Sequence, residues 1–524
     1  MSENSSVAPE VVPEFGKVRK FLFPVHSFEV KKALPMGMMF FFILFNYTCL
    51  RNLKDALVVT APNSGAEVLP FLKGWLVMPC AVLFTFLYAK GSDAMSCEKL
   101  FYVTMGIFIA FFGIFGFVIY PNLNILHPAA KTVAEWQNAH KTWAWPLAAV
   151  GNWSFALFYM MAELWGSVAL SLLFWQFANQ ICKTSEAKRF YAFFGLLAQF
   201  SLLLAGELAD AFAKTESQSK SVFWIIGIVV ASGLLVMCIY RWIYVYVLTD
   251  KKLYDKPELP GAKKKKTKMG FWQSMKIMVT SPYLGLIAAL VICYGISVNL
   301  MEGLWKGQAH TIYSDKNQFN AFMGRYSRYT GIVSIFVMIV GGNILRKFSW
   351  FTAAVITPVL TLITGSLFFA FVIWKDSFAD SLASFADTLT RVLKPEEAIV
   401  ITPVIAAVLL GEIILILAKS TKYALFDLTK EMAYIPLDEE MKVKGKVVVD
   451  VVGGRLGKAS GAWIQLGLLT IFSKIWGTKA RLIQIAPCLF GIFVVSCIVW
   501  TLAVNTLSKK ITAVTAQPPA TATS

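Results

Sequence analysis

The sequence predicts an all-α, polytopic membrane protein with twelve transmembrane helices, arranged as two six-helix pseudo-repeats. Hydrophobic residues make up 57% of its 524 residues, and the mean hydropathy is +0.62. Many apolar runs reach the ~20 residues that a helix needs to cross ~30 Å of hydrocarbon. They lack the alternation, in segments of about ten residues, that is typical of transmembrane β-strands. The third observation is a motif that closes the first apolar run and returns at the close of the seventh.

The repeated motif has the form Asn-Leu-x-acid-small-Leu. It stands at residues 52–57 and again at 299–304, where its acidic residues are Asp55 and Glu302. Matching ends on two distant helices indicate two related bundles. Parallel six-helix repeats joined by a basic loop are the architecture of the major facilitator type, in which substrate binds between the halves near the membrane midplane. We therefore expect a major-facilitator-like fold.

The apolar runs define the expected spans in chain order. They lie near 33–59, 67–90, 97–120, 146–182, 186–213 and 219–248 in the first half, and near 273–304, 318–346, 350–375, 396–432, 445–474 and 478–506 in the second. The fourth and tenth runs are about twice as long as a bilayer requires. Each of them either projects into the cytoplasm or breaks midway.

The chain divides into five expected parts. These are a tail at 1–32, an N-terminal bundle at 33–248, a basic linker at 249–276, a C-terminal bundle at 277–506 and a tail at 507–524. Lys and Arg concentrate in cytoplasmic loops, and the loops on the side of both termini are the richer ones, so we expect both termini in the cytoplasm. No apolar segment precedes the first span, so we expect no cleavable signal peptide.

The net charge of +18 follows from the same enrichment of basic residues in cytoplasmic loops, so it does not indicate nucleic-acid binding. It also suits attraction of an anionic solute. The eight cysteines are scattered without a C-x-x-C pair, and the chain has only four histidines. We therefore expect no disulfide framework, no metal and no cofactor.

Charged residues recur inside the expected spans, although each costs ~2.5–3.5 kcal/mol at mid-bilayer on insertion scales. Lys73 follows the start of the second span, Glu163 lies near the middle of the fourth, and Glu302 closes the seventh. The tenth and eleventh spans add Lys419, Lys444, Lys446, Asp450 and Arg455. Such charges can pair internally or, near a span end, reach the membrane surface. The functional alternative is a water-filled cavity whose basic residues bind phosphate oxygens.

Residues 453–460 resemble the phosphate-binding loop of ATPases only superficially. Val452 and Ala459 stand where that pattern requires Gly and Ser or Thr. No Ser-, Cys- or His-based catalytic constellation is apparent either. We expect a protein that is not an enzyme.

The sequence resembles a known family, the ATP/ADP translocases or nucleotide transporters of obligate intracellular bacteria and plastids. The resemblance covers nearly the whole chain. It is carried by KDALVVTAP at 54–62, PFLK at 70–73, FYMMAELWGS at 158–167, FANQ at 177–180, EAKRFY at 186–191, KVKGK at 442–446 and LGK at 456–458. The family has two lysines and two glutamates of functional importance. The resemblance places these on Lys73, Glu163, Glu302 and one of Lys444 and Lys446, of which we choose Lys446 as the deeper in its helix.

The resemblance implies electroneutral or near-neutral exchange of ATP for ADP, with phosphate as a candidate companion of ADP. We expect a monomeric, alternating-access antiporter in a bacterial cytoplasmic membrane, importing host ATP, with no transit peptide. Lysines of both halves would bind the phosphates and Asn179 the base or ribose, while Tyr159, Trp165 or Phe426 would stack on adenine. Proton-coupled nucleotide symport, which other family members perform, is the alternative. A non-transporting membrane scaffold is a third reading, and it leaves the buried charges without a role.

Overall fold

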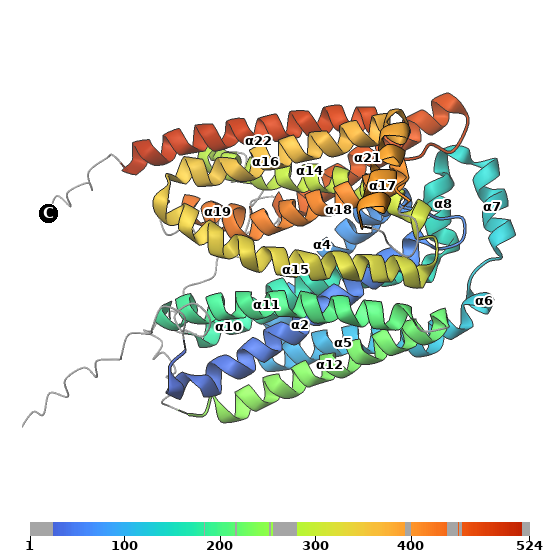
Figure 1. Ribbon diagram of the computed structural model, residues 1–524. Helices are drawn as coiled ribbons and strands as arrows, with labels where there is room; N and C mark the ends of the chain where they lie inside the picture. The colour runs from blue at the N-terminus through green and yellow to red at the C-terminus, as the bar shows by residue number, and fades with distance from the viewer. Residues whose placement is uncertain are drawn as a thin grey trace, which may run out of the picture.

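The structure is a computed structural model that describes residues 25–182, 184–214, 217–250, 253–254, 280–393, 400–437, 449 and 453–515. Within these ranges all regular secondary structure is helical. The long helices run side by side in two groups (Figure 1). One group contains α2, α5, α11 and α12, and the other contains α14, α15, α16, α18 and α22. Most of the linker at 249–276 lies outside the described residues.

The helices of the first half follow the apolar runs of the sequence. Their bounds are α2 (Val30–Val59), α3 (Val68–Phe71), η2 (Leu72–Val77), α4 (Met78–Ala94), α5 (Cys97–Ile114), α7 (Ala130–Ala139), α8 (Ala144–Gly151), α9 (Trp153–Trp165), η6 (Gly166–Phe174), α10 (Trp175–Ile181), α11 (Thr184–Ala213) and α12 (Gln218–Tyr246). The segments η2 and η6 are π-helical stretches within longer helices.

The second half repeats this pattern. Its helices are α14 (Pro282–Ile312), α15 (Lys316–Lys347), α16 (Trp350–Trp374), α17 (Ala379–Leu393), α18 (Pro403–Thr421), the π-helical η8 (Lys422–Phe426), α19 (Asp427–Ala433), α21 (Gly454–Trp476) and α22 (Ala486–Thr515). Side chains that accept from the first free backbone N–H groups set several of the starts. Ser281 caps α14, Asp315 caps α15, and Thr402 caps α18.

Ten helical segments of the described chain are long and apolar enough to cross a membrane. Two further long helices, α15 and α21, are more polar, but they pack between apolar ones. α15 lies against α11 and α18, and α21 lies against α14, α3 and η2. Their polarity fits this inner position because the faces that they share with neighbours do not meet lipid. The ten segments and these two helices together make up the twelve spans that the sequence predicts.

Some boundaries differ from the predicted ones. The seventh span does not end near Glu302: α14 continues to Ile312, so the placement of Glu302 at the close of a span is wrong. The twelfth span begins at Ala486, later than predicted. The fourth run breaks at Asn152, between α8 and α9. Two helices also occupy predicted loops, α7 and α17, because both are too short and too polar to register as apolar runs.

Glycines set the closest approach between the two halves. A Cβ added to Gly206 of α11 would lie 2.6 Å from the carbonyl oxygen of Gly324 of α15. Within the second half, a Cβ on Gly295 of α14 would lie 2.9 Å from the backbone of Gly457 of α21. Small residues let helix backbones meet closely where lipid cannot drive association. The α11–α15 crossing therefore depends on the absence of side chains at Gly206 and Gly324.

This crossing can be tested with Gly206→Val. The new side chain would collide with the backbone of α15, and overpacking of this kind typically costs ~1–3 kcal/mol. We expect a lower thermal unfolding midpoint for the purified protein. Gly195→Val is the matched control on the same helix, because a Cβ at Gly195 meets nothing within 4 Å. Equal midpoints for the two variants would contradict this account of the crossing.

Candidate functional site

A cavity of about 290 Å³ lies between the two halves. Its charged lining is strongly basic, with three carboxylates, Asp55, Glu163 and Glu302, against eight cations. The cations are Arg51, Lys54, Lys73, Lys306, Lys419, Lys422, Arg455 and Lys458. A second cavity, of about 340 Å³, is lined by Lys316 and by mostly apolar residues near the α5–α9 connection, such as Leu123 and Phe155. The density of charge in the first cavity makes it the candidate site.

Helical spacing delivers the charges to the cavity. Lys54 and Asp55 follow Arg51 by three and four residues on α2, so each of them lies on the same side of the helix as Arg51. Glu302 and Lys306 stand four apart on α14 and share a face in the same way. The lining residues Lys73 and Lys422 come from the π-helical segments η2 and η8. Single π-helical turns of this kind are frequent at functional sites.

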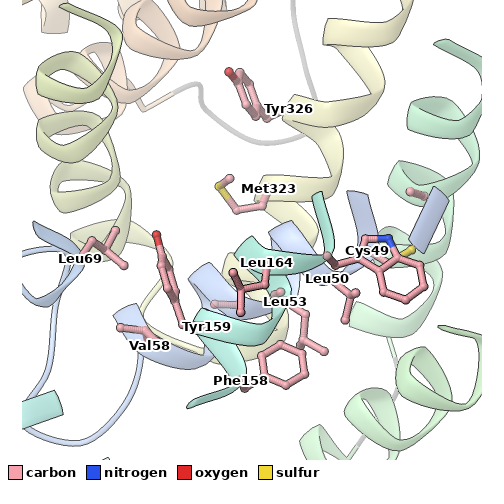
Figure 2. Close-up of a cluster of buried hydrophobic side chains, with 14 of the residues drawn as sticks. Cys49, Leu50, Leu53, Val58, Leu69, Phe158, Tyr159, Leu164, Met323 and Tyr326 are labelled. Atoms are coloured by element: carbon pink, nitrogen blue, oxygen red, sulfur yellow. The ribbon is translucent and has the colours of Figure 1, made fainter. Parts of the chain in front are cut away.

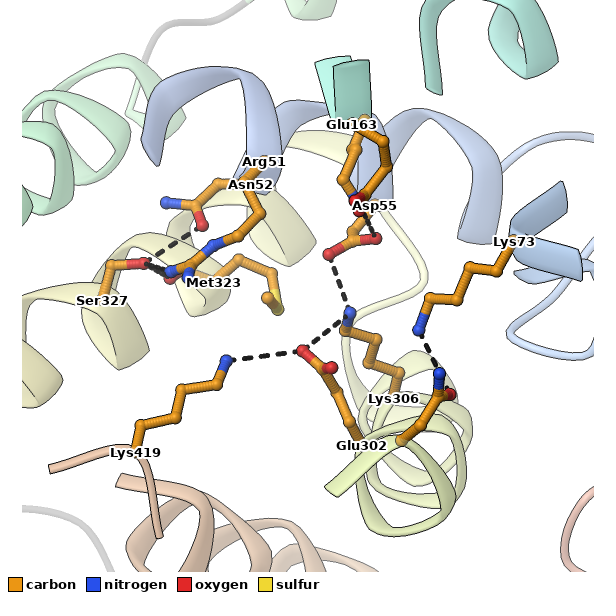
Figure 3. Close-up of polar contacts among 12 residues, drawn as sticks. Arg51, Asn52, Asp55, Lys73, Glu163, Glu302, Lys306, Met323, Ser327 and Lys419 are labelled. Carbon is orange, nitrogen blue, oxygen red and sulfur yellow. Dashed lines mark hydrogen bonds and ion pairs between the residues drawn. The ribbon is translucent and has the colours of Figure 1, made fainter. Parts of the chain in front are cut away.

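Six of the charged groups form one chain of ion pairs. Figure 3 shows the part that runs from Asp55 through Lys306 and Glu302 to Lys419. Lys54 Nζ lies 3.0 Å from Glu163 Oε1 and 2.9 Å from Asp55 Oδ1. Lys306 Nζ lies 2.8 Å from Asp55 Oδ2 and 3.2 Å from Glu302 Oε1. Lys419 Nζ completes the chain, 3.5 Å from Glu302 Oε1. Three ammonium groups therefore balance the three carboxylates.

The centre of this chain of ion pairs joins the two halves. Lys54, Asp55 and Lys306 are each at most 2% exposed. The Asp55–Lys306 contact links α2 of the first half to α14 of the second. Removing one member of such a pair leaves an uncompensated buried charge. The pair therefore holds the halves together at this depth only while both charges are present.

Other cations of the cavity have no carboxylate partner among the described residues. Lys73 Nζ lies 3.4 Å from the amide oxygen of Asn299, and Arg51 donates to Ser327 Oγ at 3.0 Å. Arg455 lies 3.5 Å from Thr85 Oγ1. Lys458 lines the cavity with an exposed side chain. These four groups account for most of the surplus positive charge, and they come from both halves.

Aromatic side chains lie beside this charge. Tyr47, Tyr294 and Tyr423 line the cavity, and the Tyr294 ring stacks on Phe426 with centroids 5.3 Å apart. The three residues predicted to stack on adenine, Tyr159, Trp165 and Phe426, do not line the cavity. They are core residues, each at most 4% exposed.

Tyr159 and Trp165 have other contacts. The Tyr159 ring carries the Lys54 ammonium 3.8 Å from its centroid and packs beside Val58 and Leu69 (Figure 2). The Trp165 indole donates to the Ile43 carbonyl at 3.1 Å. Tyr159 therefore supports a lining residue, Lys54, whereas Trp165 ties α9 to α2.

The halves are also joined at the end of the bundle where α2 and α14 end. The Trp145 indole N–H donates to the Ala480 carbonyl at 2.9 Å, and the Leu482 N–H donates to a Glu67 carboxylate oxygen at 3.2 Å. Burial raises the pKa of the Glu67 carboxyl, which lies outside the spanning segments. Together with the Asp55–Lys306 pair, these contacts join the two halves on this side.

The structure brings five of the predicted site residues to this cavity: Lys73, Glu163, Glu302, Lys419 and Arg455. Asn179 is not among them. It is exposed on α10, where its amide oxygen accepts from the Tyr191 hydroxyl at 2.6 Å. Lys444, Lys446 and Asp450 lie outside the described residues.

Among the charged lining residues the prediction missed six: Arg51, Lys54, Asp55, Lys306, Lys422 and Lys458. Two signals could have found half of them. Lys54 and Asp55 stand in the repeated motif, and Lys306 lies one helical turn beyond Glu302. Lys306 was not predicted because it lies beyond 304, the predicted end of the seventh span.

Comparison with known proteins gives a consistent result. A model of the TLC ATP/ADP transporter family matches residues 9–511. The chain is 45% identical over 504 residues to ADP,ATP carrier protein 1 of Chlamydia trachomatis, covering 94% of this chain and 91% of that protein. It is 45% identical over 499 residues to ADP,ATP carrier protein 1 of Rickettsia bellii, with 94% and 96% covered. It is 42% identical over 462 residues to ADP,ATP carrier protein 2, chloroplastic, of Arabidopsis thaliana, with 87% and 71% covered.

Solved structures support the fold. A bacterial homologue of the iron transporter ferroportin superposes with a TM-score of 0.56 at 12% identity, covering 92% of this chain and 100% of that one. The POT family transporter PepTSo gives 0.55 at 11% identity, with 91% and 98% covered. The predicted major-facilitator-like fold is confirmed. With a family match across most of its length and close relatives in both bacteria and plastids, the chain belongs to the TLC ATP/ADP transporter family, whose members are transporters and not enzymes.

Proposed function

We propose that this protein exchanges ATP for ADP by alternating access and so imports host ATP into an intracellular bacterium. The observation that carries the proposal is the surplus of cations from both halves around one cavity between them. Basic groups at membrane depth are costly unless they meet an anionic partner. ATP and ADP are polyanions of the required kind, and they are the substrates named for the family.

The free cations provide a site for the phosphate chain. Lys73 and Arg51 of the first half and Lys458 of the second line the same cavity without a carboxylate partner in the described chain. Charge-assisted hydrogen bonds to phosphate are stronger than neutral ones. We infer that these three groups bind the phosphates. Lys446, the residue chosen from the family resemblance, stays a candidate for the same role.

The tyrosines supply a surface for the base. Tyr294 is fixed by stacking on Phe426 and by an edge contact with Trp500, and it faces the cavity. Offset stacking on such a rigid ring favours a flat heterocycle. We infer that adenine stacks on Tyr294 or Tyr423, which line the cavity, and not on Tyr159, Trp165 or Phe426, which do not. Asn179 is exposed on α10 and does not line the cavity, so it has no part in this proposal.

The charge balance explains why transport would be an exchange. When the site is empty, the carrier would have to change from one open conformation to the other while its unpaired cations are enclosed without a negative charge beside them. Either nucleotide supplies that charge, so the loaded carrier reorients more readily than the empty one. When the cavity opens on the side where α2 and α14 terminate, Asp55 and Lys306 would then separate.

We also infer the placement of the protein in the membrane. The richer basic loops lie on the side of both termini, which puts the termini in the cytoplasm, and the linker at 249–276 divides the two bundles. Both halves of one chain line the cavity, which supports a monomer as the working unit. Phosphate movement with ADP would offset the difference in charge between ADP and ATP.

Exchange predicts a dependence on internal nucleotide. Vesicles that contain the protein and are preloaded with ADP should take up labelled ATP much faster than empty vesicles, because the loaded carrier returns more readily. Labelled phosphate added inside with ADP reports whether it leaves in the same cycle. Equal uptake without preloading would overturn exchange, and stimulation by a proton gradient would then support proton-coupled symport. No nucleotide flux under any condition would favour a scaffold.

The phosphate site predicts the effect of Lys458→Ala. Loss of one charge-assisted contact of ~1.5–3 kcal/mol should raise the KM for ATP by about tenfold to a hundredfold. Lys474→Ala is the matched control, since Lys474 is exposed on the same helix away from the cavity. Lys446→Ala, measured in parallel, tests the residue chosen from the family resemblance. An unchanged KM in Lys458→Ala would remove Lys458 from the site.

The buried pair predicts coupling between its members. Asp55→Asn alone should destabilise the protein by ~3–5 kcal/mol, because it leaves Lys306 buried with less counter-charge. Lys306→Met in addition should recover part of that loss, and thermal unfolding of both singles and the double measures the interaction. Glu98→Gln is the control, since it breaks the exposed Glu98–Arg241 pair, which is worth only ~0–1 kcal/mol. If the destabilisation of the double variant equals the sum of the two single destabilisations, the two residues do not act as a pair.

A further inference from the structure

The connection between α16 and α18 contains an amphipathic helix, α17 (Ala379–Leu393). Leu382, Phe385 and Leu389 repeat at three- and four-residue spacing, which puts them on one face. Asp380 and Asp387 are exposed and lie on the opposite face. The Phe385 side chain is 55% exposed. The apolar face is therefore only partly covered by the protein.

The chain reaches α17 from a lipid-facing surface. Along α16, Ile363 is 55%, Leu367 is 59% and Trp374 is 56% exposed. A turn then follows, in which the Phe378 ring stacks on Phe371 of α16 with centroids 5.4 Å apart. Because Phe371 lies nearly one turn before the end of α16, this contact holds the start of the connection against that helix. Phe378 is itself 42% exposed, so the apolar surface of α16 continues onto the connection.

The direction of α17 differs from that of its neighbours. The spanning helices run parallel to one another, whereas α17 runs across them (Figure 1). Lys375, in the turn before α17, reaches Gln308 near the end of α14 at 3.4 Å. The connection is thus tethered at the end of the bundle where α14 ends. A helix that crosses the spanning direction at that level lies along the membrane surface.

We propose that α17 is an interfacial helix whose Phe385 face inserts into the bilayer surface at this end of the bundle. Amphipathic helices of this kind bury their apolar side chains at the boundary between headgroups and acyl chains. The exposed polar face carries Asp380, Asp387 and Arg391, and the preceding turn carries both Lys375 and Asp376. It is not a basic patch, so attraction to anionic lipid does not drive the contact. The partner is the apolar boundary of a bilayer of any headgroup charge.

A photo-crosslinking experiment on the full chain tests this. p-Benzoylphenylalanine replaces Phe385 in one variant and Asp387 in the other, and each is reconstituted in phosphatidylcholine nanodiscs and irradiated. Mass spectrometry of the intact protein should detect lipid adducts in the variant with the crosslinker at 385 and none in the variant with the crosslinker at 387. Substituting phosphatidylglycerol for part of the lipid should leave the yield at 385 unchanged. Equal lipid adducts at both positions, or adducts at 385 only with anionic lipid, would overturn the proposal.

The same experiment separates other occupants of this face. A second copy of the chain on this face would give crosslinked dimers at 385 in place of lipid adducts, and this result also overturns the proposal. Uptake of ATP into ADP-loaded vesicles verifies that each variant is folded. A further arm needs no artificial residue: hydrogen exchange at 379–393 should be slower in nanodiscs than in short-chain detergent. Phe385→Asp should abolish the difference in exchange between the two media, and Asp387→Asn should keep it. Equal exchange in both media for the unmodified protein would contradict the proposal.

Discussion

The ion pair between Asp55 and Lys306 is the contact on which the rest of this structure depends. It joins the two halves through side chains that are almost fully buried, with the nitrogen and oxygen 2.8 Å apart. An isolated charge at such a depth is costly, so each partner is tolerable only beside the other. The neighbouring pairs through Lys54 and Glu302 extend this requirement across the cavity. The two halves can separate here only if another source of charge replaces what each loses.

The chain of ion pairs gives the internal repeat a physical meaning. Asp55 and Glu302 hold the same place in the repeated motif, on the first helix of each half. In the structure Lys306 contacts both of them. The symmetry is not complete, because the lysine comes from one half alone. A single ammonium group therefore contacts both related acids. Its loss would remove the ion pairs that join α2 and α14 at this depth, while the crossing of α11 and α15 still holds the two halves together.

The cations of the cavity fall into two groups, those with carboxylate partners and those without. Lys54, Lys306 and Lys419 are matched by three carboxylates, which fixes their positions. Lys73, Arg51, Arg455 and Lys458 have no carboxylate partner in the described chain, and they line the same cavity. In the proposed exchange, a polyanion would bind these cations without first breaking the ion pairs with carboxylates. Around this polar centre the outer surface remains apolar, and the Phe385 face of α17 belongs to that surface.

The sequence by itself determined the elements and the character of the site. Apolar runs of bilayer length define membrane helices whatever surrounds them, and the cost of charge in hydrocarbon singled out Lys73, Glu163, Glu302 and Lys419 before any contact was known. Only the tertiary structure decided which charges pair and which stay free, because that depends on distances between helices far apart in the chain. It moved Glu302 from a helix end into the middle of α14, added Lys306 and Lys458 to the cavity, and left Asn179 outside it. Hydropathy is a local property, whereas the pairing of buried charges is a property of the assembled bundle.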